Sequence, residues 1–386
     1  SSTTCKIPKM TFYDEISRYN WDDITKKIYA SKPADVERAL AERGNVSLDD
    51  FAALVSPAAE NYLEAMAQKS AEITRRRFGK VIQLYTPLYL SNYCSNRCIY
   101  CGFNCGNKIK RTVLSQEQIA IEAEAIRKHP FEHILLVTGE APAKAGVEYL
   151  GESITTMKRY FSQTSIEVQP LDTDDYRYLM DKGLHSVYVY QETYNEKNYP
   201  LYHLAGKKRD YRYRLETPDR LGEAGVYKIG VANLIGLEEW RTDAFFTALH
   251  TRYLENKYWR TKCSISFPRL RPFVGEGFQP NYPANERQLL QLICAYRLLS
   301  EDVEISLSTR ESPYFRDNVM TLGITTLSAG SKTAPGGYSD YDKNKELEQF
   351  SVNYDLSVDD VVRSEKAHGM AAVWKDWSLY MQSSKI

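Results

Sequence analysis

Residues 81–105, VIQLYTPLYLSNYCSNRCIYCGFNC, join an apolar stretch to a loop that carries four cysteines. The apolar part, residues 81–90, is rich in β-branched and aromatic side chains and reads as a strand. The loop spaces its first three thiols as Cys94-x3-Cys98-x2-Cys101, and Cys105 follows. The whole chain of 386 residues holds only seven cysteines, so this concentration of thiols needs a chemical explanation.

The pattern that begins at residue 81 repeats along the chain. Further apolar strand candidates lie at 133–139, 165–171, 186–192, 227–236, 264–268, 304–309 and 323–330. Helical stretches between them lie at 115–129, 172–183, 209–225, 242–256 and 285–300. Eight strands with helical crossovers predict an α/β fold with a parallel sheet, and eight units favour closure into a (β/α)8 TIM-type barrel. An open doubly wound sheet is the structural alternative.

The barrel pattern is flanked by two different segments. Residues 12–78 read as helical, with an interruption at Pro57. Beyond residue 330 the alternation is lost in a long polar stretch, and a short helix is expected at 359–370. We therefore expect an N-terminal helical extension (1–80), a barrel (81–330) and a C-terminal extension packing on the barrel (331–386).

The bulk composition excludes several classes of protein. Fifty basic residues balance fifty acidic ones, so no nucleic-acid-binding face is expected. The run Lys207-Lys208-Arg209 reads as a solvated loop. No stretch of about 18 apolar residues predicts a membrane span, and no secretory signal is visible. Sparse cysteines outside the loop argue against a disulfide framework and favour a reducing, cytoplasmic setting.

Three readings compete for the cysteine loop. A structural zinc site needs four closely held ligands, and the chain has no second paired motif to supply them. A catalytic thiol pair would be expected to open a helix rather than to lie in a long loop. An iron–sulfur cluster suits soft thiolates, and three cysteines leave one iron of a 4Fe–4S cube free for a substrate or cofactor. Cys105 could close the cluster, although a bystander role is favoured.

The CxxxCxxC spacing, with Tyr100 before the last cysteine, resembles the signature of the radical S-adenosylmethionine (SAM) enzymes. Further segments, including LLVTGE (135–140), RLETPDRLGEAG (214–225) and LSTRESPYFRD (307–317), resemble the aromatic amino acid lyases, and within them the tyrosine lyases of thiamine biosynthesis. The likeness extends from about Trp21 to Trp377. It implies that Cys94, Cys98 and Cys101 bind a 4Fe–4S cluster and that SAM binds the fourth iron.

The same resemblance assigns residues to the cofactor. Gly139 and Glu140, after the second strand, would meet the methionyl ammonium of SAM, because an acid pairs with this charge and glycine allows close approach. Arg214 would grip the cofactor carboxylate, with Arg212 as a neighbour that the sequence cannot exclude. Tyr100, the aromatic residue before Cys101, is a further cofactor candidate. By their strand positions, Glu167 and Glu192 also point to the barrel mouth and join the cofactor candidates. The two glutamates could orient cofactor hydroxyls or accept a substrate proton, and a structural hydrogen bond is the alternative.

Two substrate candidates, Ser308 and Arg310, belong to the seventh strand and its end, and two more come from other strands. Arg310 resembles the family's clamp on the amino acid carboxylate, and Ser308 is delivered to the barrel mouth with it. The alternative for Arg310 is a salt bridge with Glu311. Tyr89 and Ser328 match positions that line the amino acid site of related lyases, although either could simply pack in the barrel.

The resemblance implies cleavage of the Cα–Cβ bond of L-tyrosine to dehydroglycine and p-cresol. It also implies a reductant such as flavodoxin or ferredoxin, and transfer of the imine to thiazole synthase in a physical complex. A rival is the tyrosine lyase of hydrogenase maturation, whose C-terminal extension carries further cysteines, whereas here none follows Cys294. A tryptophan lyase and, in another class, a closed-cluster electron carrier or zinc-stabilised scaffold remain alternatives.

Overall fold

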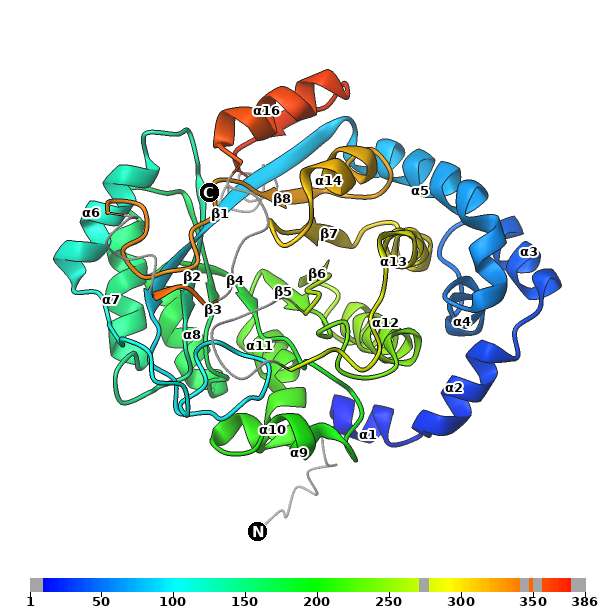
Figure 1. Ribbon diagram of the computed structural model, residues 1–386, viewed down its shortest axis with the longest axis horizontal. Coiled ribbons are helices and arrows are strands. Elements are labelled where there is room, and N and C mark those ends of the chain that lie inside the picture. Colours follow the sequence, from blue (N-terminus) through cyan, green and yellow to red (C-terminus); the bar gives the residue numbers. More distant parts are fainter. Residues whose placement is uncertain (1–9, 271–277, 341–346, 350–355, 376–386) are drawn as a thin grey trace, which may run out of the picture.

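The computed structural model describes residues 10–270, 278–340, 347–349 and 356–375. Its centre is a barrel of parallel strands in which β1 pairs with both β2 and β8, and this double pairing closes the sheet (Figure 1). The barrel strands are β1(Val81–Ser91), β2(His133–Thr138), β3(Gln163–Glu167), β4(Leu184–Tyr188), β5(Lys228–Val231), β6(Lys262–Ser266), β7(Glu304–Leu307) and β8(Thr326–Ser328). The eight predicted strands and the closed barrel are confirmed.

Helices surround the barrel and connect its strands (Figure 1). They are α6(Gln116–Ile126), α7(Val147–Met157), α8(Thr173–Lys182), α9(Tyr199–Tyr202), η2(Lys207–Arg209), α10(Tyr211–Leu215), α11(Thr217–Ala224), α12(Trp240–Lys257), α13(Glu286–Leu299) and α14(Pro313–Val319).

One helical prediction needs correction, and a further helix was not predicted. The stretch 209–225, expected as one helix, forms α10 and α11, which are separated at Glu216. Pro218 explains the break, because its ring cannot follow the last turn of a helix but fits the first turn of a new one. Helix α7 was not predicted. It contains Gly151, where an added Cβ would lie 2.8 Å from the Tyr178 ring, so tight helix packing uses a residue with poor helix propensity.

The N-terminal helices pack on one side of the barrel. They are α1(Phe12–Ile16), α2(Trp21–Tyr29), α3(Pro33–Ala41), α4(Leu48–Leu54), η1(Pro57–Tyr62) and α5(Leu63–Phe78). Helices α2, α4 and α5 contact α12 and α13, as Figure 1 shows in blue against green and yellow. The Phe51 ring lies 5.0 Å from the Tyr296 ring, centroid to centroid, so this layer shares the barrel's hydrophobic core.

The last described part of the chain packs on the outside of the barrel, next to α14 and β1 (Figure 1). Helix α16(Val358–Ala367) leads to β9(Ala371–Val373), which pairs in parallel with the first residues of β1 from Val81. The helix was expected, whereas β9 was not. Within the described ranges, no helix has the length and apolar character needed to cross a bilayer.

Polar side chains fill the inside of the barrel at the N-terminal ends of its strands. The Lys228 ammonium lies 2.5 Å from the Glu304 carboxylate, and both side chains are almost fully buried. The Gln83 amide donates to Gln163 at 3.2 Å. Because this end is plugged, access to the barrel interior is left to the C-terminal ends of the strands, where barrel enzymes place their chemistry.

Candidate active site

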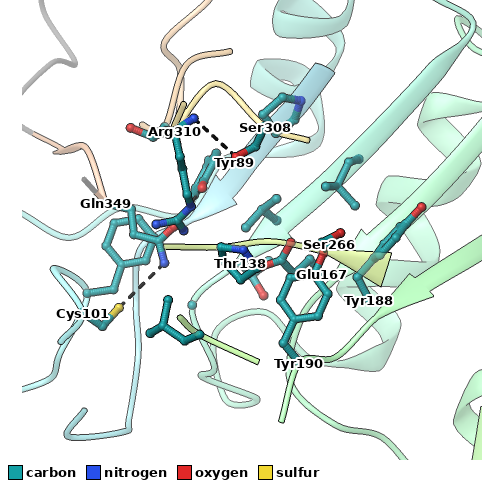
Figure 2. Close-up of a pocket in the computed structure, with 18 of the residues that line it drawn as sticks. Tyr89, Cys101, Thr138, Glu167, Tyr188, Tyr190, Ser266, Ser308, Arg310 and Gln349 are labelled. Atoms are coloured by element: carbon teal, nitrogen blue, oxygen red, sulfur yellow. Dashed lines mark hydrogen bonds between the residues drawn. The ribbon is translucent and has the colours of Figure 1, made fainter. Parts of the chain in front are cut away.

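A cavity of about 200 Å³ opens at the C-terminal ends of the barrel strands. Figure 2 shows side chains from different strands and loops converging on it. Apart from the alternatives Arg212 and Cys105, the candidate site residues from the sequence line this cavity: Tyr89, Cys94, Cys98, Tyr100, Cys101, Gly139, Glu140, Glu167, Glu192, Arg214, Ser308, Arg310 and Ser328. Residues far apart in the sequence therefore share one site.

The cysteine loop is fixed to the turn after β2. The Ser95 backbone N–H donates to the Glu140 carbonyl oxygen at 2.9 Å, and the Gly139 N–H donates to the Ser91 carbonyl at 3.0 Å. At Gly139 an added Cβ would lie 2.2 Å from the Tyr93 carbonyl oxygen. The close approach that requires this glycine is thus made by the backbone of the cysteine loop, which any side chain would displace.

The thiols suit a cluster held by three cysteines. Cys94, Cys98 and Cys101 line the cavity, whereas Cys105 is exposed and is not part of its wall. Burial raises the pKa of Cys94 to about 11, so iron binding must displace a proton there. Among the described residues, no group of three His, Cys, Asp or Glu side chains is placed to hold a single metal ion. In a 4Fe–4S cube each cysteine binds a different iron.

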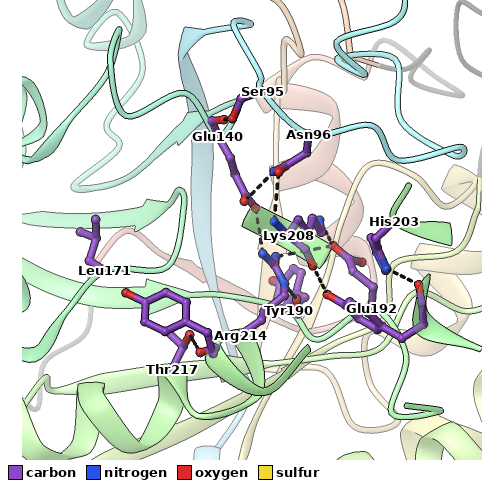
Figure 3. Close-up of polar contacts among 12 residues, drawn as sticks. Ser95, Asn96, Glu140, Leu171, Tyr190, Glu192, His203, Lys208, Arg214 and Thr217 are labelled. Carbon is purple, nitrogen blue, oxygen red and sulfur yellow. Dashed lines mark hydrogen bonds and ion pairs between the residues drawn. The ribbon is translucent and has the colours of Figure 1, made fainter. Parts of the chain in front are cut away.

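An ion pair between Glu140 and Arg214 lies beside the cysteine loop (Figure 3). The Glu140 carboxylate accepts hydrogen bonds from Arg214 Nη1 and from Asn96 Nδ2, each at 2.8 Å. Burial acts to raise the pKa of Glu140, but the Arg214 and Lys208 cations outweigh it and lower the pKa. The pair thus presents a fixed anion and a fixed cation to the cavity, as an amino acid zwitterion requires.

Arg212 does not share this site. Its side chain is largely exposed and pairs with Glu216 at 3.1 Å, one turn along the helix. Arg214, in contrast, is buried and also donates through Nε to the Tyr190 carbonyl oxygen at 2.6 Å. Of the two arginines, only Arg214 therefore lines the cavity.

The run Lys207-Lys208-Arg209 was expected to be a solvated loop, and this prediction is wrong for Lys208. Lys207 and Arg209 are exposed, whereas Lys208 is partly buried. The Lys208 ammonium lines the cavity and lies 2.7 Å from the Glu192 carboxylate (Figure 3). Glu192 has a positive φ of 72°, a backbone conformation that is uncommon outside glycine and that clusters at functional sites. This strained backbone directs the carboxylate toward Lys208 and Arg214.

Tyr100 is held by a neutral histidine. Its hydroxyl lies 2.8 Å from His203 Nε2, and His203 Nδ1 lies 2.9 Å from the Tyr199 carbonyl oxygen. Burial and the nearby Lys208 cation lower the pKa of His203 to about 2, so the ring is neutral. It must donate from Nδ1 to the carbonyl, which leaves Nε2 to accept the Tyr100 proton.

The two serines shape the turn that carries Arg310. The Ser308 hydroxyl oxygen accepts from the Arg310 backbone N–H at 3.3 Å, and the Ser328 oxygen accepts from the Thr309 N–H at 3.0 Å. Glu311, the proposed alternative partner of Arg310, is bonded by Arg269 Nε at 2.8 Å. The geometry therefore turns Arg310 into the cavity and Glu311 toward a different arginine.

Glu167 is a cavity carboxyl group whose pKa is raised. Burial raises its pKa to about 7, the nearby Arg310 cation opposes this shift, and the Glu192 anion adds to it. Tyr188, Tyr190 and Ser266 lie on the same side of the cavity in Figure 2. A carboxyl group that is poised near neutral pH can hold or release a proton during turnover.

Sequence reasoning missed Asn96, Lys208 and Gln349 as parts of the site. Asn96 lies inside the cysteine motif, and its side-chain oxygen accepts from the Lys208 backbone N–H at 3.0 Å. Its position between two predicted ligands was an available signal. Lys208 and Gln349 carried no local signal, since their partners lie on distant strands and loops.

The chain is similar to known proteins over nearly its whole length. Residues 88–245 match the Radical SAM superfamily, and residues 266–371 match the Biotin and Thiamin Synthesis associated domain. The chain is 50% identical over 372 residues to the 2-iminoacetate synthase of Escherichia coli (strain K12), covering 96% of this chain and 98% of that protein. The 2-iminoacetate synthase of Salmonella typhimurium (strain LT2) matches to the same extent.

A solved structure of another protein is also similar to this chain. The hydrogenase maturase HydG superposes with a TM-score of 0.83 at 27% identity, over 96% of this chain and 80% of that one. Members of the radical SAM superfamily use a 4Fe–4S cluster and S-adenosylmethionine. By its identity over nearly the full length of those relatives, this chain belongs to the 2-iminoacetate synthase family of radical SAM enzymes.

Proposed function

We propose that this chain cleaves the Cα–Cβ bond of L-tyrosine to 2-iminoacetate and p-cresol, as a step toward the thiazole of thiamine. The observation that supports this best is that one cavity holds a loop with three thiols, the Glu140–Arg214 ion pair and the turn that carries Arg310. The names of the relatives support the same reaction.

In this proposal the side chains divide between cluster and cofactor. Cys94, Cys98 and Cys101 hold the cluster, and the adjacent Glu140 and Arg214 bind the ammonium and carboxylate of S-adenosylmethionine. When bound, the two groups supply the 5′-deoxyadenosyl radical that removes a hydrogen from the substrate amino group. The remaining cofactor contacts are assigned to Gly139, Glu167, Glu192 and Tyr100.

The substrate side of the cavity fixes which N–H faces the cofactor. Arg310 offers a planar pair of donors to the tyrosine carboxylate. Ser308 and Ser328 hold the turn that carries this arginine, and Tyr89 lines the wall beside it. Such positioning controls radical chemistry, since orientation decides which bond is attacked. The buried Lys228–Glu304 pair blocks the N-terminal end of the barrel, which limits access of water and oxygen to the cavity from that side.

The proposal includes two protein partners. A small electron carrier such as flavodoxin or ferredoxin reduces the cluster. Thiazole synthase receives the imine, and a physical complex is expected because the imine hydrolyses readily. The reaction takes place in the cytoplasm.

The test is an anaerobic assay of the iron- and sulfide-reconstituted protein with tyrosine, S-adenosylmethionine and reductant, followed by chromatography for p-cresol. Arg310→Gln should abolish product while the exposed Arg212→Gln retains it. Consumption of tryptophan with tyrosine untouched would overturn the substrate assignment. A cluster spectrum that does not respond to S-adenosylmethionine would instead indicate a closed electron-transfer site.

A further inference from the structure

Gln349 lies in the cavity wall against the cysteine loop (Figure 2). Its backbone N–H donates to the Thr333 carbonyl oxygen at 3.0 Å. Its own carbonyl oxygen packs on Gly102, where an added Cβ would lie 2.3 Å away from that oxygen. The residue is thus placed by contacts on both sides, and the glycine after Cys101 is what permits its approach.

The carboxamide of Gln349 bridges two residues of the site. The Tyr89 hydroxyl lies 2.8 Å from Gln349 Oε1, and Gln349 Nε2 lies 3.7 Å from Cys101 Sγ. Burial raises the pKa of Tyr89, so its hydroxyl is protonated and donates to Oε1. That bond fixes the orientation of the amide and leaves an N–H group directed at the sulfur.

We propose that Gln349 is a positioning residue that donates a hydrogen bond to the Cys101 thiolate, oriented by Tyr89, and that this bond raises the reduction potential of the cluster. The inference rests on the proposed function, since it takes Cys101 as a cluster ligand. A donor to a ligand sulfur stabilises the extra electron of the reduced cluster, and such hydrogen bonds are a recognised lever on cluster potentials.

The experiment measures the midpoint potential of the reconstituted protein by anaerobic titration monitored by electron paramagnetic resonance, without substrate turnover. Gln349→Leu removes the donor, and we expect the equilibrium constant for reduction to fall about tenfold, a lowering of about 59 mV for a one-electron couple. Gln349→Glu keeps the shape but sets an anion against the sulfur, so its potential should fall further. Gln68→Glu, exposed on α5, is the matched control and should leave the potential unchanged.

Each outcome decides the matter. Midpoint potentials that fall from wild type to Gln349→Leu and fall again to Gln349→Glu support the hydrogen bond to Cys101. Identical potentials in the three proteins overturn it. If Gln349→Glu fails to retain iron, the Gln349→Leu potential decides alone. If Gln349→Leu also loses its iron while Gln68→Glu keeps it, the residue acts in cluster retention and the inference about potential is wrong. If wild-type protein forms no 4Fe–4S cluster on Cys94, Cys98 and Cys101, the proposed function itself fails.

Discussion

Replacing Glu140 by glutamine tests how the cavity recognises its cofactor. The carboxylate accepts from two donors at once, Arg214 and Asn96, each at 2.8 Å. A glutamine offers one oxygen and one NH2 group, so in either orientation one N–H donor faces another. It also removes the anion proposed to meet the cofactor ammonium. Hydrogen bonds to charged groups contribute about 1.5–3 kcal/mol, so we expect a loss of about 2–3 kcal/mol in S-adenosylmethionine binding.

At 1.4 kcal/mol for each factor of ten, this loss corresponds to an increase in Kd of about 30- to 150-fold. The assay is anaerobic equilibrium dialysis with labelled cofactor, on protein whose iron and sulfide have first been counted. Glu117→Gln, exposed in the first turn of α6, serves as the control. A Glu140→Gln protein with a full cluster and an affinity within about threefold of wild type would refute the reasoning.

Three further changes test other parts of the structure. Gly139→Ala should displace the cysteine loop, because its Cβ would lie 2.2 Å from the Tyr93 carbonyl oxygen; iron bound per chain should fall, and normal loading would contradict this. The pKa of Glu167 is raised to about 7 from 4.5. The folded chain therefore binds an extra proton between these values, and stability should fall as pH rises through them, by about 3 kcal/mol at 1.36 kcal/mol per unit. Urea titrations of Glu167→Gln should lack this slope. Lys228→Met leaves Glu304 buried and unpaired, which should cost about 3–5 kcal/mol in urea unfolding; the double variant Lys228→Met/Glu304→Leu should recover most of that loss.

Much of the fold could be predicted from local patterns. The eight strands are short apolar runs such as residues 133–139. Strands of a parallel sheet are buried on both faces, so their side chains are apolar along the whole run, and this pattern is visible in the sequence. Helix α7 was missed because Gly151 and its threonines are poor helix formers, and tertiary packing overrides that preference. Strand β9 was missed because three residues are too few to show an alternation of apolar and polar side chains. These residues form a strand because they pair with the first residues of β1.

The site divides in the same way. The cysteines, Glu140 and Arg310 were predictable because their motifs follow strand ends, which a barrel brings to one face. Lys208 was misjudged because its neighbours in the sequence are solvated, whereas its partner Glu192 comes from another loop. Gln349 had no motif at all, since its contacts to Tyr89 and Cys101 span more than 240 residues of chain.

The path of the chain after residue 330 also bears on the order of events during synthesis. Residues such as Thr333 and Gln349 reach the cavity wall, and β9 pairs with β1, only after the ribosome has made the whole barrel. In a nascent chain the cysteine loop therefore lacks these wall residues until the segment that carries them has been translated. Delivery of iron and sulfide during this interval would meet a more open mouth than delivery to the finished protein.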